Sequence, residues 1–129
     1  MPALTQPSKG ALWTGRIFSG LIVAFMGFDA IVKIIKIPAA VEGTAKLGYP
    51  PNVLVPIGLV ALACVVLYVI PSTSVLGAIL LTGYLGGATA TQVRMSDPWF
   101  VLPVLLGVLA WLGLYLRDVG LHPIIPFRN

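Results

Sequence analysis

Three charged residues interrupt a long apolar run near the start of the chain. Asp29, Lys33 and Lys36 lie within the stretch FMGFDAIVKIIK. Their spacings of four and three residues place them on one face of a helix. If that helix crosses a membrane, Asp29 lies well inside the hydrocarbon, where a charge costs roughly 2.5–3.5 kcal/mol on insertion scales. We therefore expect Asp29 to face other helices rather than lipid.

Two interpretations of these charges are open from the sequence. In the first, Asp29 and Lys33 form an ion pair that neutralises itself, while Lys36 extends to the lipid headgroups. In the second, the same side chains line a polar pocket or transfer protons between helices, because ionisable residues within a membrane are functional candidates by default.

A second stretch, LTGYLGGATATQVR, could form the facing side of such a pocket. Its small residues are typical of helices that approach each other closely. We predict that helix packing involves Gly83, Gly86, Gly87 and Ala90. Its polar residues lie near the same bundle end as those of the first run, which suits either a site for a polar head with an apolar tail or a structural charge network. The candidate ligand-binding or proton-relay residues are Asp29, Lys33, Glu42, Tyr84, Gln92 and Arg94.

The composition indicates a protein that uses lipid as its solvent. Of 129 residues, 58% are hydrophobic and only 9% are charged, and the mean hydropathy is +1.00. Soluble domains carry roughly 25% charged residues, so this chain could not cover a globular surface with polar groups. The net charge of +4 suits an anionic membrane surface. The basic residues are scattered, which argues against nucleic-acid binding.

Four apolar segments are long enough to span a bilayer, which takes about 20 residues at 1.5 Å per residue. Backbone groups find no water in lipid, so segments of this length must be helical. We predict an all-α integral membrane four-helix bundle with up-down-up-down topology, forming one domain over residues 1–129. The predicted helices cover about residues 12–37, 53–70, 75–93 and 99–116.

The connections between these segments carry turn signals. A loop over residues 38–52 joins the first two, and Pro71–Ser74 forms a tight turn with Ser or Thr available as a helix N-cap. Asp97 is the expected N-cap of the last helix, with Pro98 at its first position. An even number of spans puts both termini on one side. The basic residues are divided between the two sides, and we predict a multi-pass protein of the cell (inner) membrane with cytoplasmic termini.

The residues available for metal or redox chemistry are few. The chain has one histidine, His122, and one cysteine, Cys64. Metal or haem ligation needs several such side chains converging, so we predict no metal site and no cofactor held within the chain. Cys64 is interpreted as a small hydrophobe within a span, and His122 as an interface residue near the C-terminus.

Several stretches together resemble the DoxX-like family of small integral membrane proteins. The most specific is LGAILLTGYLGGATATQVR, and others are FDAIVKIIKIP, the LGYP of the first loop, LYVIPSTSVLGA and WLGLYLRD. The resemblance covers the chain from about Arg16 to Arg128. It implies a four-helix membrane bundle, and relatives are linked to quinol oxidation, to membrane complexes of redox stress and to assembly of other membrane proteins. Many members resemble A-T-H-V-R where this chain has Gln92, which cannot titrate.

Three functions follow from the residues and the resemblance. The first is a site for a quinone- or lipid-like amphiphile in an accessory redox subunit, with a quinone as the expected ligand. The second is a non-catalytic assembly protein that packs against partner helices through the small residues. The third, least favoured, is a cofactor-free membrane isomerase that uses Asp29 or Glu42 as acid or base. We expect the chain to contact the lipid bilayer and either to self-associate or to join a larger membrane complex.

Overall fold

The computed structural model describes residues 8–125, and within them all regular structure is helical. Four long helices are each apolar enough to cross a membrane, which confirms the predicted all-α membrane bundle. A short fifth helix and three 3₁₀ turns connect them, and a fourth 3₁₀ turn follows the last long helix. The elements are α1 (Lys9–Ile34), α2 (Pro38–Lys46), η1 (Pro51–Val53), α3 (Leu54–Val69), η2 (Pro71–Thr73), α4 (Ser74–Arg94), η3 (Pro98–Phe100), α5 (Val101–Arg117) and η4 (Val119–Leu121).

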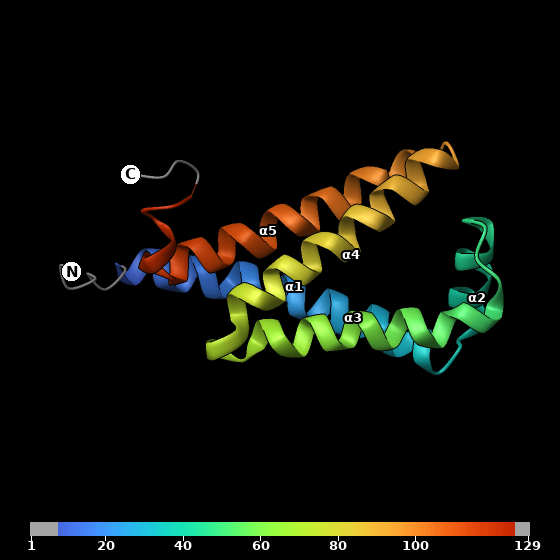
Figure 1. Cartoon of the computed structure of the whole chain (residues 1–129), viewed down its shortest axis with the longest axis horizontal. Coiled ribbons are helices and arrows are strands. Elements are labelled where there is room, and N and C mark those ends of the chain that lie inside the picture. Colours follow the sequence, from blue (N-terminus) through green and yellow to red (C-terminus); the bar gives the residue numbers. More distant parts are fainter. Residues whose placement is uncertain (1–7, 126–129) are drawn as a thin grey trace.

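The four long helices form a closed ring. α1 packs against α3 and α5, and α4 packs against the same two helices. Both ends of the described chain and the α3–α4 turn lie at one end of the bundle, here called the terminal end (Figure 1). α2 and the α4–α5 turn lie at the other, the loop end. Towards the loop end, the α4–α5 pair diverges from the α1–α3 pair.

The predicted loop over residues 38–52 contains a helix that the sequence reading missed. α1 ends at Ile34, three residues earlier than predicted, because Lys36 adopts a left-handed conformation with φ of 54°. Pro38 then occupies the first turn of α2, where its missing N–H is not needed. α2 has only nine residues, so its hydrophobic pattern is too short to stand out.

Three helices at the loop end finish with the same backbone motif. At each, the N–H two residues beyond the C-cap bonds back to a carbonyl in the last turn: Ile37 to Val32, Tyr49 to Thr44 and Asp97 to Gln92. This is the Schellman arrangement, which needs a left-handed residue. Gly48 supplies it after α2, but Lys36 and Ser96 supply it after α1 and α4. A non-glycine residue there is strained by roughly 1–2 kcal/mol.

The predicted caps are confirmed at one turn and wrong at the other. Asp97 accepts a hydrogen bond from the Trp99 N–H at 2.9 Å, with Pro98 at the first position of η3. In the α3–α4 turn, the hydroxyls do not cap α4. Thr73 donates instead to the Leu67 carbonyl, and Ser74 donates to the Tyr68 carbonyl, both at 2.8 Å. These bonds satisfy carbonyls at the end of α3, where no helix partner exists.

Close helix approaches occur at other glycines than those predicted. A side chain at Gly15 would collide with Gly113 and Arg117 of α5, and one at Gly58 would collide with the Ala30 carbonyl of α1. By contrast, an added Cβ at Gly83, Gly86 or Gly87 would meet nothing within 4 Å. Ala90 is exposed on the same helix. Within this chain, therefore, the predicted packing stripe of α4 makes no close contact and faces outward.

A buried polar network, here called the terminal network, joins three helices at the terminal end. Tyr68 is only 1% exposed, and its hydroxyl donates to the Ala110 carbonyl at 2.6 Å. Because its hydrogen is used there, Ser19 Oγ donates to Tyr68 Oη at 2.8 Å. Arg117 Nε then donates to Ser19 Oγ at 3.2 Å. The bonds run in one direction from α5 through α1 and α3 and back to α5.

Candidate functional site

A cleft of about 670 Å³ opens at the loop end, among α1, α2, α4 and α5. The two helix pairs diverge at this end of the bundle (Figure 1). Most of the cleft wall is apolar, with aromatic and aliphatic side chains from α1 and α5. Seven polar or charged side chains also line it: Asp29, Lys33, Thr44, Lys46, Tyr84, Gln92 and Asp97. We call this the polar cleft.

An ion pair lies at the inner wall of the polar cleft. Lys33 Nζ is 2.6 Å from Asp29 Oδ2, across one turn of α1. The side chains of Lys33 and Asp29 are 18% and 32% exposed, respectively, so neither is fully buried. The pair forms locally because residues four apart lie above one another on a helix. The two interpretations open from the sequence therefore coincide, since the paired charges also line a cavity.

Tyr84 joins this pair from α4. Lys33 Nζ lies 3.3 Å from Tyr84 Oη, and an ammonium group can only donate, so the tyrosine oxygen is the acceptor. The Tyr84 hydroxyl hydrogen is therefore free of this bond. Lys33 has three N–H groups and uses two of them, on Asp29 and Tyr84. We call these three residues the cleft triad.

The cleft triad leaves specific hydrogen-bonding capacity towards a ligand. Two donors remain, the Tyr84 O–H and the third N–H of Lys33. One acceptor remains in the second carboxylate oxygen of Asp29, for which the described residues provide no hydrogen bond. Such a set can hold a carbonyl oxygen with the donors and a hydroxyl group with the acceptor.

Four of the six predicted site residues meet at this cleft and two do not. Asp29, Lys33, Tyr84 and Gln92 line it. Glu42 lies on α2 but is exposed, and it does not line the cleft. Arg94 is also exposed, with one terminal nitrogen 3.4 Å from where a Cβ of Gly48 would lie. The structure thus brings four of the six candidates together at one cleft and leaves Glu42 and Arg94 outside it.

The structure adds residues that the sequence reading did not select. Thr44 and Lys46 line the cleft and lie on α2, in a segment where the sequence predicts a loop. The loop after α2 is also tied to α4. Thr91 Oγ1 donates to the Gly87 carbonyl at 2.9 Å, so the Tyr49 hydroxyl donates to Thr91 Oγ1 at 2.8 Å. This bond bridges 42 residues of sequence, and no local pattern reveals it.

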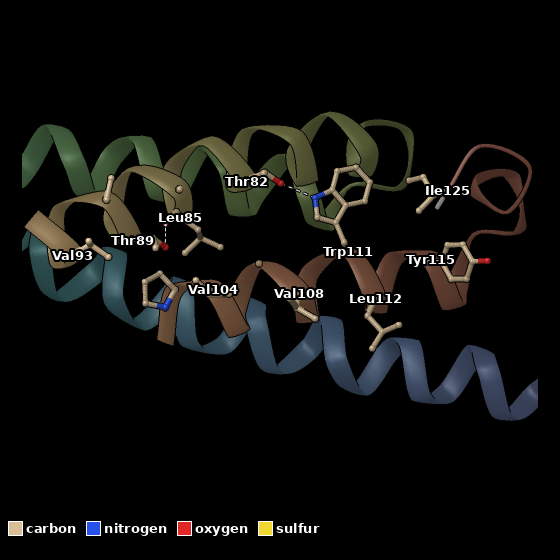
Figure 2. Close-up of a pocket in the computed structure, with 14 residues that line it drawn as sticks. Thr82, Leu85, Thr89, Val93, Val104, Val108, Trp111, Leu112, Tyr115 and Ile125 are labelled. Atoms are coloured by element: carbon tan, nitrogen blue, oxygen red, sulfur yellow. Dashed lines mark hydrogen bonds between the residues drawn. The ribbon is translucent and has the colours of Figure 1, made fainter. Parts of the chain in front are cut away.

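A larger groove of about 970 Å³ runs along the outer side of α4 and α5 (Figure 2). Its lining is almost entirely apolar. Two of its few polar side chains bond within the chain: Trp111 Nε1 donates to Thr82 Oγ1 at 2.6 Å, as Figure 2 shows, and Thr89 donates to the Leu85 carbonyl. The larger groove therefore suits lipid chains or an apolar partner.

The side chains considered for metal or redox chemistry lie apart from one another. Within residues 8–125, no three His, Cys, Asp or Glu side chains gather as metal ligands would. Cys64 is buried in α3. His122 lies at the terminal end, stacked on Tyr115 with ring centroids 4.2 Å apart, and its Nε2 is 2.9 Å from the Tyr115 carbonyl oxygen.

Comparison with known proteins gives one match. A model of the DoxX-like family matches residues 17–113, from α1 to the last turns of α5. The matched region includes every residue of the cleft triad. No curated protein and no solved structure matches the chain.

Proposed function

We propose that the polar cleft binds the head of a quinone- or lipid-like amphiphile. The chain belongs to the DoxX-like family. The observation that carries the proposal is the cleft triad, which presents free donors and an acceptor inside a mostly apolar cavity. Ligand sites of membrane amphiphiles need this combination of a few placed polar groups and a large apolar wall.

A quinone fits this hydrogen-bonding pattern in both of its redox states. Its carbonyl oxygen accepts from the Tyr84 hydroxyl and the third N–H of Lys33. The hydroxyl of the reduced form donates to the free oxygen of Asp29. When a partner protein transfers the two electrons, the same carboxylate can give or take one of the two protons that this change of redox state requires. The chain then acts as an accessory subunit that holds and orients the quinone, while a partner supplies the electrons.

The apolar wall of the cleft suits the rest of such a molecule. Phe25 and Phe28 of α1 line it on one side, and Leu102 and Leu106 on the side of η3 and α5. Phe28 is 70% exposed and Leu102 is 38% exposed, so the cleft continues to the lipid-facing surface. A tail can therefore extend into the bilayer while the head bonds to the triad.

We also propose that the protein lies in the inner membrane with cytoplasmic termini.

The test is native mass spectrometry with lipid extraction on protein purified in mild detergent. Asp29→Asn removes the charge. Its one remaining oxygen can accept from Lys33, so an NH2 donor replaces the free acceptor at the cleft. Glu42→Gln removes one negative charge from exposed α2 as the matched control. We expect wild type and Glu42→Gln to carry a long-chain quinone that Asp29→Asn loses. Equal retention by all three proteins, or no bound amphiphile in wild type, would contradict the proposal.

One observation favours a second function, that of an assembly protein. Gly83, Gly86 and Gly87 face open space on α4, so they could admit a helix of another protein closely. Gly83→Leu together with Gly87→Leu would then disrupt a complex without affecting the fold of the chain. Pull-down from membranes with this double variant would separate the two functions, because the polar cleft is untouched by it.

A further inference from the structure

The side chain of Arg117 packs against α1 at the terminal end and stays partly exposed. Its Cγ lies against Gly15, at 2.6 Å from where a Cβ would stand. Its Nε reaches Ser19 Oγ at 3.2 Å, one helical turn deeper in α1 than Gly15. Its Cζ is 5.9 Å from the centre of the Tyr68 ring. Glycine at position 15 thus makes room for the arginine side chain.

This cation has no acidic partner among residues 8–125. The one ion pair within 4.0 Å in this range is Lys33–Asp29, at the opposite end. Asp118 is adjacent in sequence, but its Oδ1 accepts from the Gly120 N–H at 2.9 Å. The carbonyl end of α5 offers about half a unit of negative charge, which compensates the arginine only in part.

The hydrogen-bonding capacity of Arg117 is also incomplete. Its Nε is bonded to Ser19, and no hydrogen bond from either terminal nitrogen is formed with the described residues. The four N–H groups on these nitrogens form the planar fork that matches two oxygens of a phosphate. Because Arg117 is partly exposed at the terminal end of a membrane-spanning bundle, a headgroup phosphate is the oxyanion that can approach this fork.

We propose that Arg117 binds the phosphate of an anionic phospholipid at the junction of α1 and α5, in the leaflet of the terminal end. The charge balance of this end selects an anionic lipid over a zwitterionic one. Its described charged residues are Lys9, Arg16, Arg117 and Asp118, three bases against one acid. This site is separate from the polar cleft, which lies at the loop end.

Binding at Arg117 would also tighten the bundle. The guanidinium is the first donor of the terminal network, which runs through Ser19 and Tyr68 to the Ala110 carbonyl. A phosphate that fixes the guanidinium holds this donor in place and stabilises the contact of α1 with α5. The anionic lipid should therefore raise the unfolding temperature as well as bind.

The experiment is native mass spectrometry of delipidated protein with added phosphatidylglycerol or phosphatidylcholine. Wild type should retain one phosphatidylglycerol at least tenfold better than phosphatidylcholine. Arg117→Gln should lose this preference. Arg16→Gln removes the same charge at the same end from an exposed side chain, which lies 5.3 Å from the Trp13 ring, and should keep the preference. Equal effects of the two variants would overturn the assignment to Arg117.

A second variant guards against misfolding of Arg117→Gln, and a competition experiment tests whether the ligand is a lipid or free phosphate. If Arg117→Gln does not fold, Arg117→Lys keeps the charge without the fork and should weaken retention about tenfold. The measurement on wild type alone also tests the proposal, because equal retention of phosphatidylglycerol and phosphatidylcholine would overturn it. Inorganic phosphate in large excess should leave the bound lipid in place and the unfolding temperature unchanged. Displacement of the lipid by phosphate would overturn the choice of a lipid ligand.

Discussion

The two ends of the bundle carry polar clusters built from similar groups but closed to different degrees. At the terminal end, Ser19 and Tyr68 are buried, and each hydroxyl is bonded within the chain. At the loop end, Lys33, Asp29 and Tyr84 are only partly buried, and each keeps unused hydrogen-bonding capacity beside a cavity. We interpret the first cluster as a structural lock and the second as a binding site.

Helix separation explains the difference. At the terminal end, Gly15 and Gly113 let α1 and α5 approach until their backbones touch. At the loop end, the α4–α5 pair diverges (Figure 1), and the aromatic side chains of α1 border the cleft without filling it. The same residue types thus stabilise the fold where helices touch and remain available to a ligand where helices part.

The largest expected effect comes from filling the tight end. In Gly113→Leu, the new side chain would begin 2.5 Å from Ser19 Oγ and 3.0 Å from the Gly15 carbonyl oxygen. We expect a loss of about 3 kcal/mol or more in unfolding free energy. Gly83→Leu is the control, since position 83 faces open space. Thermal unfolding in detergent compares them, and similar losses in both variants would contradict the packing described for α1 and α5.

A smaller effect is expected from removing one hydroxyl of the terminal network. Tyr68→Phe removes the side-chain donor to the Ala110 carbonyl and leaves the Ser19 hydroxyl hydrogen without its acceptor. A buried donor left unsatisfied in this way costs about 1–3 kcal/mol. Tyr84→Phe, at the open end, should change the unfolding free energy by less than about 0.5 kcal/mol. Denaturant unfolding of both variants measures these changes. Equal losses of unfolding free energy in the two variants would contradict the difference described between the two ends.

The smallest effect concerns the strained helix ends around the cleft. Lys36→Gly places glycine where φ is 54°, so the strain of a side chain there is relieved. Glycine also gains freedom in the unfolded chain, which leaves a net stabilisation of about 0.5–1 kcal/mol. Lys46→Gly, at the last residue of α2, is the opposite control and should destabilise. A lower unfolding temperature for Lys36→Gly would show that the lysine side chain contributes more than its backbone strain costs.

The sequence predicted what depends on local spacing and composition. The four spans follow from apolar length, and the Asp29–Lys33 pair follows from an i, i+4 relation on one helix. The contact of Lys33 with Tyr84 was predicted only as proximity of two bundle ends. It depends on how far α1 and α4 stand apart, and no single segment encodes that distance.

Other features escaped prediction because their local patterns are ambiguous. A stripe of small residues looks the same on a packed face and on an outward face, so Gly83 and Gly87 could not be told apart from Gly15 and Gly113. Tyr68 lies in an uninterrupted apolar run, and no neighbouring residue in the sequence indicates that its hydroxyl joins a buried polar network. The nine residues of α2 follow a proline that reads equally well as loop.

The central claim is that the open cluster binds a quinone head through the free hydroxyl of Tyr84. It is tested most directly by titrating a short-chain quinone into purified wild type and Tyr84→Phe, with Tyr49→Phe as the control tyrosine outside the triad. Losing one hydrogen bond of about 0.5–1.5 kcal/mol should raise the Kd roughly two- to tenfold in Tyr84→Phe alone. Identical Kd values in the three proteins, or no saturable binding in wild type, would contradict the account.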